Sequence, residues 1–94
     1  MSKHLLVRHV VADYPSWKIA FDSHQGERQK HGLKELHILR DQTNQNHVTI
    51  LLEAQDLERA KAFATSENLR EIMQKAGVVG NPEVCYLSDA TKSY

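Results

Sequence analysis

Residues 47–54, with the sequence HVTILLEA, form a strand-like run that is apolar on both of its faces. Side chains alternate between the two faces of a strand, so one face of this run carries Val48, Ile50, Leu52 and Ala54. Leu51 lies on the other face. Residues 4–11 repeat the pattern, because Leu5 and Val7 are opposed by Leu6 and Val10. A sheet built from such strands needs cover on both sides.

The other segments predict a small α+β domain. Strands are expected at residues 4–11, 33–40, 47–54 and 83–88. The polar loop 41–46 has hairpin chemistry, and Gly80-Asn81-Pro82 has turn chemistry. A first helix should begin about Pro15 and run to His31, with Gly32 as its stop. A second should follow Asp56 as its N-cap, in two pieces that end before Gly77.

This order predicts a ferredoxin-like βαββαβ fold with a four-stranded antiparallel sheet and helices on one face. The 94 residues suit a single domain over 1–94. The helices can cover only one face of the sheet, so the second apolar face predicts a partner sheet from another copy of the chain. Burial of several hundred Å² at ~25 cal/mol/Å² gives a gross gain of order 10 kcal/mol, part of which association entropy removes.

The first helix carries a stripe of rings and charges. Its members step by three or four residues and therefore share one helical face: Tyr14, Trp17, Phe21, His24 and Arg28. The stripe is either core packing or the wall of a pocket. A neutral imidazole at His24 could take a proton from a phenol or a carbon acid, or could simply bond a backbone carbonyl or a carboxylate.

Arg8 and His9 point to opposite faces of the first strand, so one of them faces the helices. Either side chain could bind an anionic substrate. Alternatively, it could form an ion pair with Glu35 or Glu53 across the sheet. Arg28 and Asp13 lie at the two ends of the first helix, where a solvated surface or a capping role would suffice.

Several of these residues together resemble a subgroup of the dimeric α+β barrel superfamily, the antibiotic biosynthesis monooxygenase-like proteins. The resemblance runs over residues 4–87 and is carried by Val7-Arg8-His9, Asp13-Tyr14, Trp17-Lys18, Phe21-Asp22, His24, Arg28 and Ala76-Gly77-Val78. It implies a homodimer in which two sheets face each other. It also implies a cavity between helices and sheet, and an activity without metal or flavin.

The superfamily holds cofactor-independent monooxygenases acting on aromatic polyketides, polyketide cyclases, lactone isomerases, haem-degrading enzymes and ligand sensors. Under the oxygenase or cyclase reading, His24 is the base and Arg8 or His9 meets developing negative charge. Tyr14, Trp17, Phe21 and Arg28 then contact an apolar or aromatic substrate. The alternative is a non-catalytic binding or assembly module whose aromatic stripe is only core. Haem degradation is disfavoured. The haem-degrading members rely on a histidine on the second helical segment, whereas Trp17 and His24 here both lie on the first helix.

Composition narrows the remaining classes. Twelve basic residues balance twelve acidic ones, so the chain has no excess positive charge with which to bind nucleic acid or an anionic membrane surface. The six histidines show no metal-binding spacing, and no phosphate loop or hydrolase elbow occurs, so we expect no metal and no cofactor. The lone Cys85 should be a buried, inert thiol. The chain has no signal-like or membrane-spanning run, which predicts a cytoplasmic protein.

Overall fold

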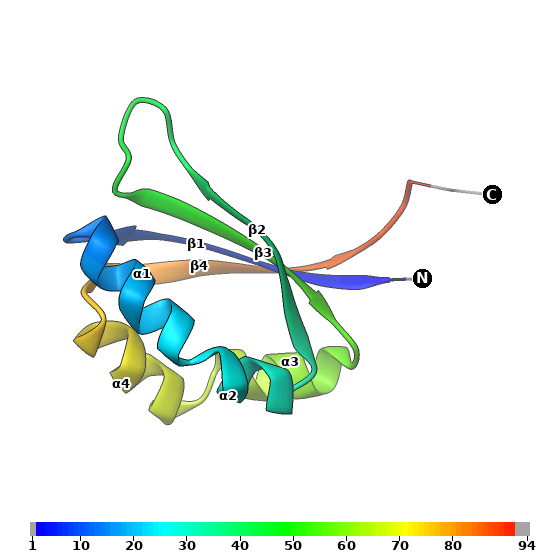
Figure 1. The fold of residues 1–94 in the computed structure, drawn as a ribbon. Coiled ribbons are helices and arrows are strands. Elements are labelled where there is room, and N and C mark those ends of the chain that lie inside the picture. Colours follow the sequence, from blue (N-terminus) through cyan, green and yellow to red (C-terminus); the bar gives the residue numbers. More distant parts are fainter. Residues whose placement is uncertain (1, 92–94) are drawn as a thin grey trace.

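The computed structural model describes residues 2–91. Along the chain lie β1 (Lys3–Val11), α1 (Tyr14–Ser23), α2 (Gln25–Lys30), β2 (Leu33–Arg40), β3 (His47–Ala54), α3 (Leu57–Ala64), α4 (Glu67–Lys75) and β4 (Val78–Ser88). The strands form one antiparallel sheet in the order β2-β3-β1-β4. All four helices lie on one face of it (Figure 1). The predicted ferredoxin-like α+β fold is confirmed.

Local sequence explains where the helices begin. Asp13 accepts a hydrogen bond from the backbone N–H of Ser16 at 3.1 Å, and Pro15 occupies the first turn of α1. Asp56 accepts from the N–H groups of Glu58 and Arg59 at the start of α3. The capping role predicted for Asp56 is confirmed, and of the two roles considered for Asp13 the structure shows the capping role. Gly77, with φ +90°, follows α4 in a conformation that other residues rarely adopt.

The first helical segment is not continuous, contrary to the prediction. It divides at His24, where the backbone N–H bonds the carbonyl of Phe21. The carbonyl of Ala20 instead accepts the Ser23 hydroxyl at 2.7 Å and His24 Nδ1 at 2.8 Å. Side chains that bond a helical carbonyl compete with the helical ladder. Two of them at one carbonyl therefore mark the break between α1 and α2.

The turn predicted at Gly80-Asn81-Pro82 is also wrong, because these residues lie inside β4. Val79 pairs with Val10 and Glu83 with Arg8, so three residues of β4 stand opposite His9. Gly80, with φ +73°, supplies the unusual backbone that such a bulge requires. The turn-forming residues thus bend the strand without ending it.

The core lies between the helices and the inner face of the sheet. That face is buried along β1 and β3, and its apolar side chains are Leu5, Val7, Val11, Val48, Ile50, Leu52 and Ala54. Trp17 of α1 and Ala60 of α3 pack against them from the helical layer. Of the two faces that the sequence pattern separates, the one with Val48, Ile50 and Leu52 on β3 therefore faces the helices.

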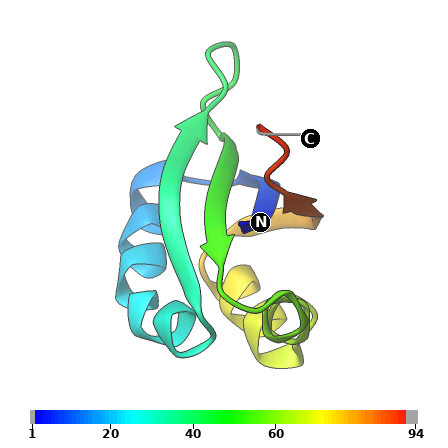
Figure 2. The same cartoon turned by 90° about the vertical axis from the view of Figure 1, so that its right-hand side faces the viewer.

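The outer face of the sheet has no helix over it (Figure 2). Leu6 lies at its centre, beside Leu51 of β3 and Cys85 of β4. Cys85 is half-buried, less than predicted, because it belongs to this uncovered face. Toward the rim, Leu39 and Val79 are 53% and 54% exposed. The second apolar face inferred from the sequence is therefore present.

Candidate functional site

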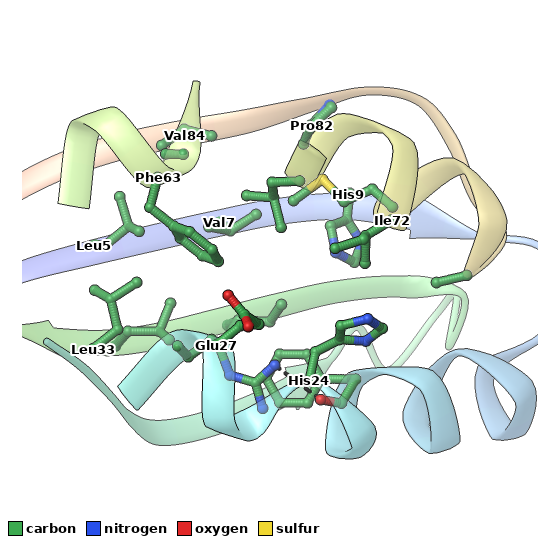
Figure 3. Close-up of a pocket in the computed structure, with 18 of the residues that line it drawn as sticks. Leu5, Val7, His9, His24, Glu27, Leu33, Phe63, Ile72, Pro82 and Val84 are labelled. Carbon is green, nitrogen blue, oxygen red and sulfur yellow. Dashed lines mark hydrogen bonds between the residues drawn. The ribbon is translucent and has the colours of Figure 1, made fainter. Parts of the chain in front are cut away.

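A cavity of about 100 Å³ lies between the helical layer and the inner face of the sheet. Its floor comes from β1, β3 and the first residue of β2, and its walls come from all four helices and from β4. Most lining side chains are apolar, among them Leu5, Val7, Ile50, Phe63, Leu69, Ile72 and Met73. Figure 3 shows two imidazoles and one carboxylate among them, those of His9, His24 and Glu27. The cavity is therefore apolar, with a few polar groups brought in from opposite layers.

His24 reaches the cavity from the break between α1 and α2. Its Nδ1 lies 2.8 Å from the carbonyl oxygen of Ala20, which can only accept a hydrogen bond. Nδ1 must therefore carry a proton, and in the neutral ring the lone pair then belongs to Nε2. The bond to a backbone carbonyl, one of the two interpretations of His24, is therefore present, and the ring also lines the cavity.

His9 enters the cavity from the sheet, opposite the helices. The side of β1 that faces the helices is therefore the one that carries His9. The residue is 5% exposed, and its Nδ1 has no hydrogen-bond partner among residues 2–91. Burial lowers the pKa of His9 below its ordinary value, and a contact with its own backbone carbonyl opposes this. The imidazole is therefore held neutral at neutral pH.

The aromatic residues of α1 divide into two groups. Trp17 stacks on Phe21 with ring centroids 4.9 Å apart and meets the edge of His9 at 5.4 Å, and all three line the cavity. Tyr14 does not line it. Its ring packs 5.7 Å from Trp17 and lies under the guanidinium of Arg40, at 3.8 Å. Tyr14 therefore supports Trp17 from outside the cavity, contrary to the ligand contact expected of it.

Arg28 lines the cavity but is already paired. Its Nε donates to the carboxylate of Glu35 on β2, and its Nη1 donates to the carbonyl of Phe21 at 2.8 Å. The guanidinium carbon lies 3.6 Å from the centre of the Phe21 ring. The side chain is only 9% exposed, so the solvated surface role considered for it is wrong. Arg28 holds Phe21 and α2 against the sheet, and its charge is neutralised where it lies.

Arg8 lies on the outer face of the sheet, away from the cavity. It donates to Asp41 at 2.8 Å and to the hydroxyl of Thr49 at 3.3 Å. His47 Nδ1 is 3.3 Å from the same Asp41 carboxylate. The hydrogen bond from Arg8, together with its charge, is the main cause that lowers the pKa of Asp41. Arg8 therefore forms a surface ion pair, although neither Glu35 nor Glu53 is its partner.

Sequence reasoning missed Glu27, and of the residues of α4 it missed Leu69 and Ile72. Glu27 lines the cavity three residues after His24, and its carboxylate also lies 3.5 Å from Lys30. Glu27 lies one helical turn after His24, so helical spacing could have revealed it. The stripe predicted from the sequence instead took the four-residue step from His24 to Arg28. Leu69, Ile72 and Met73 belong to the second piece of the helical segment expected after Asp56. Nothing in their spacing says that they meet His24 across the fold.

Within residues 2–91, no three His, Cys, Asp or Glu side chains gather in a way that could hold a metal ion. In the same part of the chain, no helix is both long and apolar enough to cross a membrane.

No protein-family model matches the sequence, and no curated protein matches it significantly. Solved structures do match. A protein of Bordetella bronchiseptica, provisionally named an antibiotic biosynthesis monooxygenase, has a TM-score of 0.75 at 10% identity, with 94% of this chain and 96% of that one covered. The chain has the subunit fold of the antibiotic biosynthesis monooxygenase-like proteins.

Two further matches carry the same fold. SnoaB of Streptomyces nogalater, a cofactor-independent oxygenase, has a TM-score of 0.73 at 10% identity, with 98% of this chain and 96% of SnoaB covered. A conserved protein of Methanosarcina mazei has a TM-score of 0.69 at 15% identity, with 93% and 91% covered. At such identities the likeness concerns the fold, and one fold supports many activities.

Proposed function

We propose that this protein binds a small aromatic molecule in the cavity between helices and sheet and acts on it as a cofactor-independent monooxygenase. The observation that carries the proposal is an apolar cavity lined by two imidazoles, His9 and His24, from opposite layers. Apolar pockets with a few convergent polar groups are the usual form of small-molecule sites. The fold shared with SnoaB, an oxygenase that uses no cofactor, supports the oxygenase reading.

In this proposal His24 is the general base. Its Nδ1 is committed to the carbonyl of Ala20, so its Nε2 can accept a proton from a phenol or an activated CH₂ group. The resulting anion is electron-rich enough to react with O₂. Conversion of a CH₂ group to a carbonyl by O₂ releases one molecule of water, so the substrate itself supplies the electrons. His9, neutral and buried beside Trp17, contacts the substrate from the sheet.

The cavity volume limits the ligand. An apolar cavity of about 150 Å³ binds benzene, so a cavity of about 100 Å³ has room for one ring at most and not for a polycyclic aromatic substrate. The same small volume favours the second candidate, a non-catalytic binding or assembly module. In that candidate, Trp17, Phe21, Phe63 and Met73 fill most of the space that a substrate would need.

The test compares two histidines in matched settings. His31 also bonds a backbone carbonyl through Nδ1 at 2.8 Å, that of Glu27, but it does not line the cavity. Phenol binding is measured by calorimetry, and oxygen uptake is measured with one-ring phenols. His24→Gln should lower oxygen uptake by about 10²- to 10⁴-fold, as for loss of a general base, while phenol binding persists. His31→Gln should leave both unchanged.

One result would decide against the oxygenase, and another against its assigned base. Phenol binding without any oxygen uptake above the protein-free rate would favour the binding module. Equal uptake by the wild type and His24→Gln would remove His24 as the base.

We also propose that the protein is a homodimer formed through the outer face of the sheet. This face presents Leu6 and Leu51 at its centre, and exposed Leu39 and Val79 toward its rim. An uncovered apolar face of this kind is typical of an interface. A cytoplasmic location stays a prediction from the sequence.

Two substitutions test the dimer. Leu51→Glu puts a charge at the centre of the outer face and should give a monomer in sedimentation experiments at micromolar concentration. Ile19 is the matched control, because it is 73% exposed on α1 of the helical layer. Ile19→Glu should stay dimeric. A wild-type protein that sediments as a folded monomer would contradict this proposal.

A further inference from the structure

A second hollow, of about 320 Å³, lies beside the cavity and differs from it in chemistry. Its walls come from the junction between α3 and α4, from the exposed side of α4 and from the first part of β4. Its polar lining residues are Thr65, Ser66, Glu67, Arg70, Gln74 and Asn81. We refer to it as the polar groove.

The cavity and the polar groove share one wall, made by Ala64, Met73 and Pro82. Ala64 has no rotatable side chain, and the ring of Pro82 is fixed to its backbone. Met73 is unbranched and has three rotatable bonds, so it can change shape at small cost. The half-buried side chain of Met73 is therefore the movable part of the partition between the two hollows.

The free hydrogen-bonding groups of the polar groove include one cation, the guanidinium of Arg70, which can only donate. The hydroxyls of Thr65 and Ser66 are used locally, since they donate to the carbonyls of Lys61 and Phe63. Within residues 2–91, by contrast, the side chains of Arg70, Gln74, Asn81 and Glu67 make no hydrogen bond or ion pair. The first three can each donate N–H groups, and only Glu67 is restricted to accepting.

We propose that the natural ligand is amphipathic and occupies both hollows. Its apolar end, of about one ring, lies in the cavity, and a short chain passes Met73. Its polar end carries hydrogen-bond acceptors such as a carboxylate or an amide, and it meets Arg70 in the polar groove. This inference rests on the proposed ligand-binding function and adds the ligand class. It accounts for a cavity that is too small by itself for a typical ligand.

The experiment measures binding of phenol, 3-phenylpropanoate and 5-phenylpentanoate by calorimetry. In the wild-type protein, affinity should rise with chain length and be at least about tenfold higher for 5-phenylpentanoate than for phenol, as one charge-assisted hydrogen bond provides. Arg70→Ala should remove most of that advantage and leave phenol binding unchanged. Lys75→Ala is the matched control, because it removes a cation of α4 that lies outside the polar groove, and it should have no effect.

A second variant tests the partition. Met73→Ala should raise affinity for 5-phenylpentanoate more than for phenol, provided that circular dichroism shows a folded protein. The inference is overturned if 5-phenylpentanoate binds no more tightly than phenol, or if Arg70→Ala keeps the full advantage. In both cases phenol binding would leave the proposed function standing. Failure of every probe to bind would overturn both.

Discussion

Glu35→Ala should be one of the most destabilising single substitutions outside the apolar core. The carboxylate of Glu35 is the only acidic partner of Arg28 among residues 2–91, and the two side chains are 20% and 9% exposed. Removal of Glu35 leaves a buried guanidinium without its counter-charge. The same guanidinium packs on Phe21 and bonds its carbonyl, so Arg28 cannot turn to solvent without disturbing the cavity wall.

The expected size follows from the burial of the pair. Breaking a buried ion pair by removing one partner costs about 3–5 kcal/mol, and the partial exposure of Glu35 favours the lower end, ~3 kcal/mol. Unfolding entropies of ~2.1 cal/mol/K per residue give ~0.2 kcal/mol per degree for 94 residues. The melting temperature should therefore fall by about 15 °C at fixed protein concentration.

Urea and thermal unfolding followed by circular dichroism would measure this loss. Asp22→Ala is the matched control, because it breaks the exposed pair with Lys18 on α1 and should change stability by less than about 0.5 kcal/mol. The double variant Arg28→Met, Glu35→Leu should recover most of the stability, since apolar side chains can replace a buried pair. A loss for Glu35→Ala no larger than that for Asp22→Ala would refute the reasoning.

Two further predictions concern pH and capping. Burial lowers the pKa of His9 below 6.5, so below that pH the unfolded chain takes up a proton that the folded protein resists. The free energy of unfolding should therefore fall as the pH drops from 6.5 toward the folded pKa. His9→Phe should flatten this dependence in urea titrations at pH 7.5 and 5.5, and an equal slope in both proteins would contradict it. Asp56→Ala removes the acceptor for two N–H groups of α3 and should cost about 1 kcal/mol, whereas Asp56→Asn should change little. Urea midpoints that fell equally for the two variants would argue against the capping role.

Patterns within one segment were predictable because neighbouring residues decide them. The caps at Asp13 and Asp56, the hairpin loop before His47 and the alternation of side chains between the two faces of β1 each depend on a few adjacent positions. The break at His24 was missed because it depends on two side chains that bond the same carbonyl, that of Ala20. Helical spacing carries no information about that competition.

The sequence by itself determined the order of strands and helices, the antiparallel sheet and its two apolar faces, because hydrophobic period and capping act locally. Only the tertiary structure decided which polar groups meet. It turned His9 toward the helices and Arg8 away from them, paired Arg28 with Glu35, and left Tyr14 outside the cavity. It also limited the cavity to about 100 Å³. These outcomes depend on how the helices pack against a twisted sheet, so they are determined by residues that lie far apart in the chain.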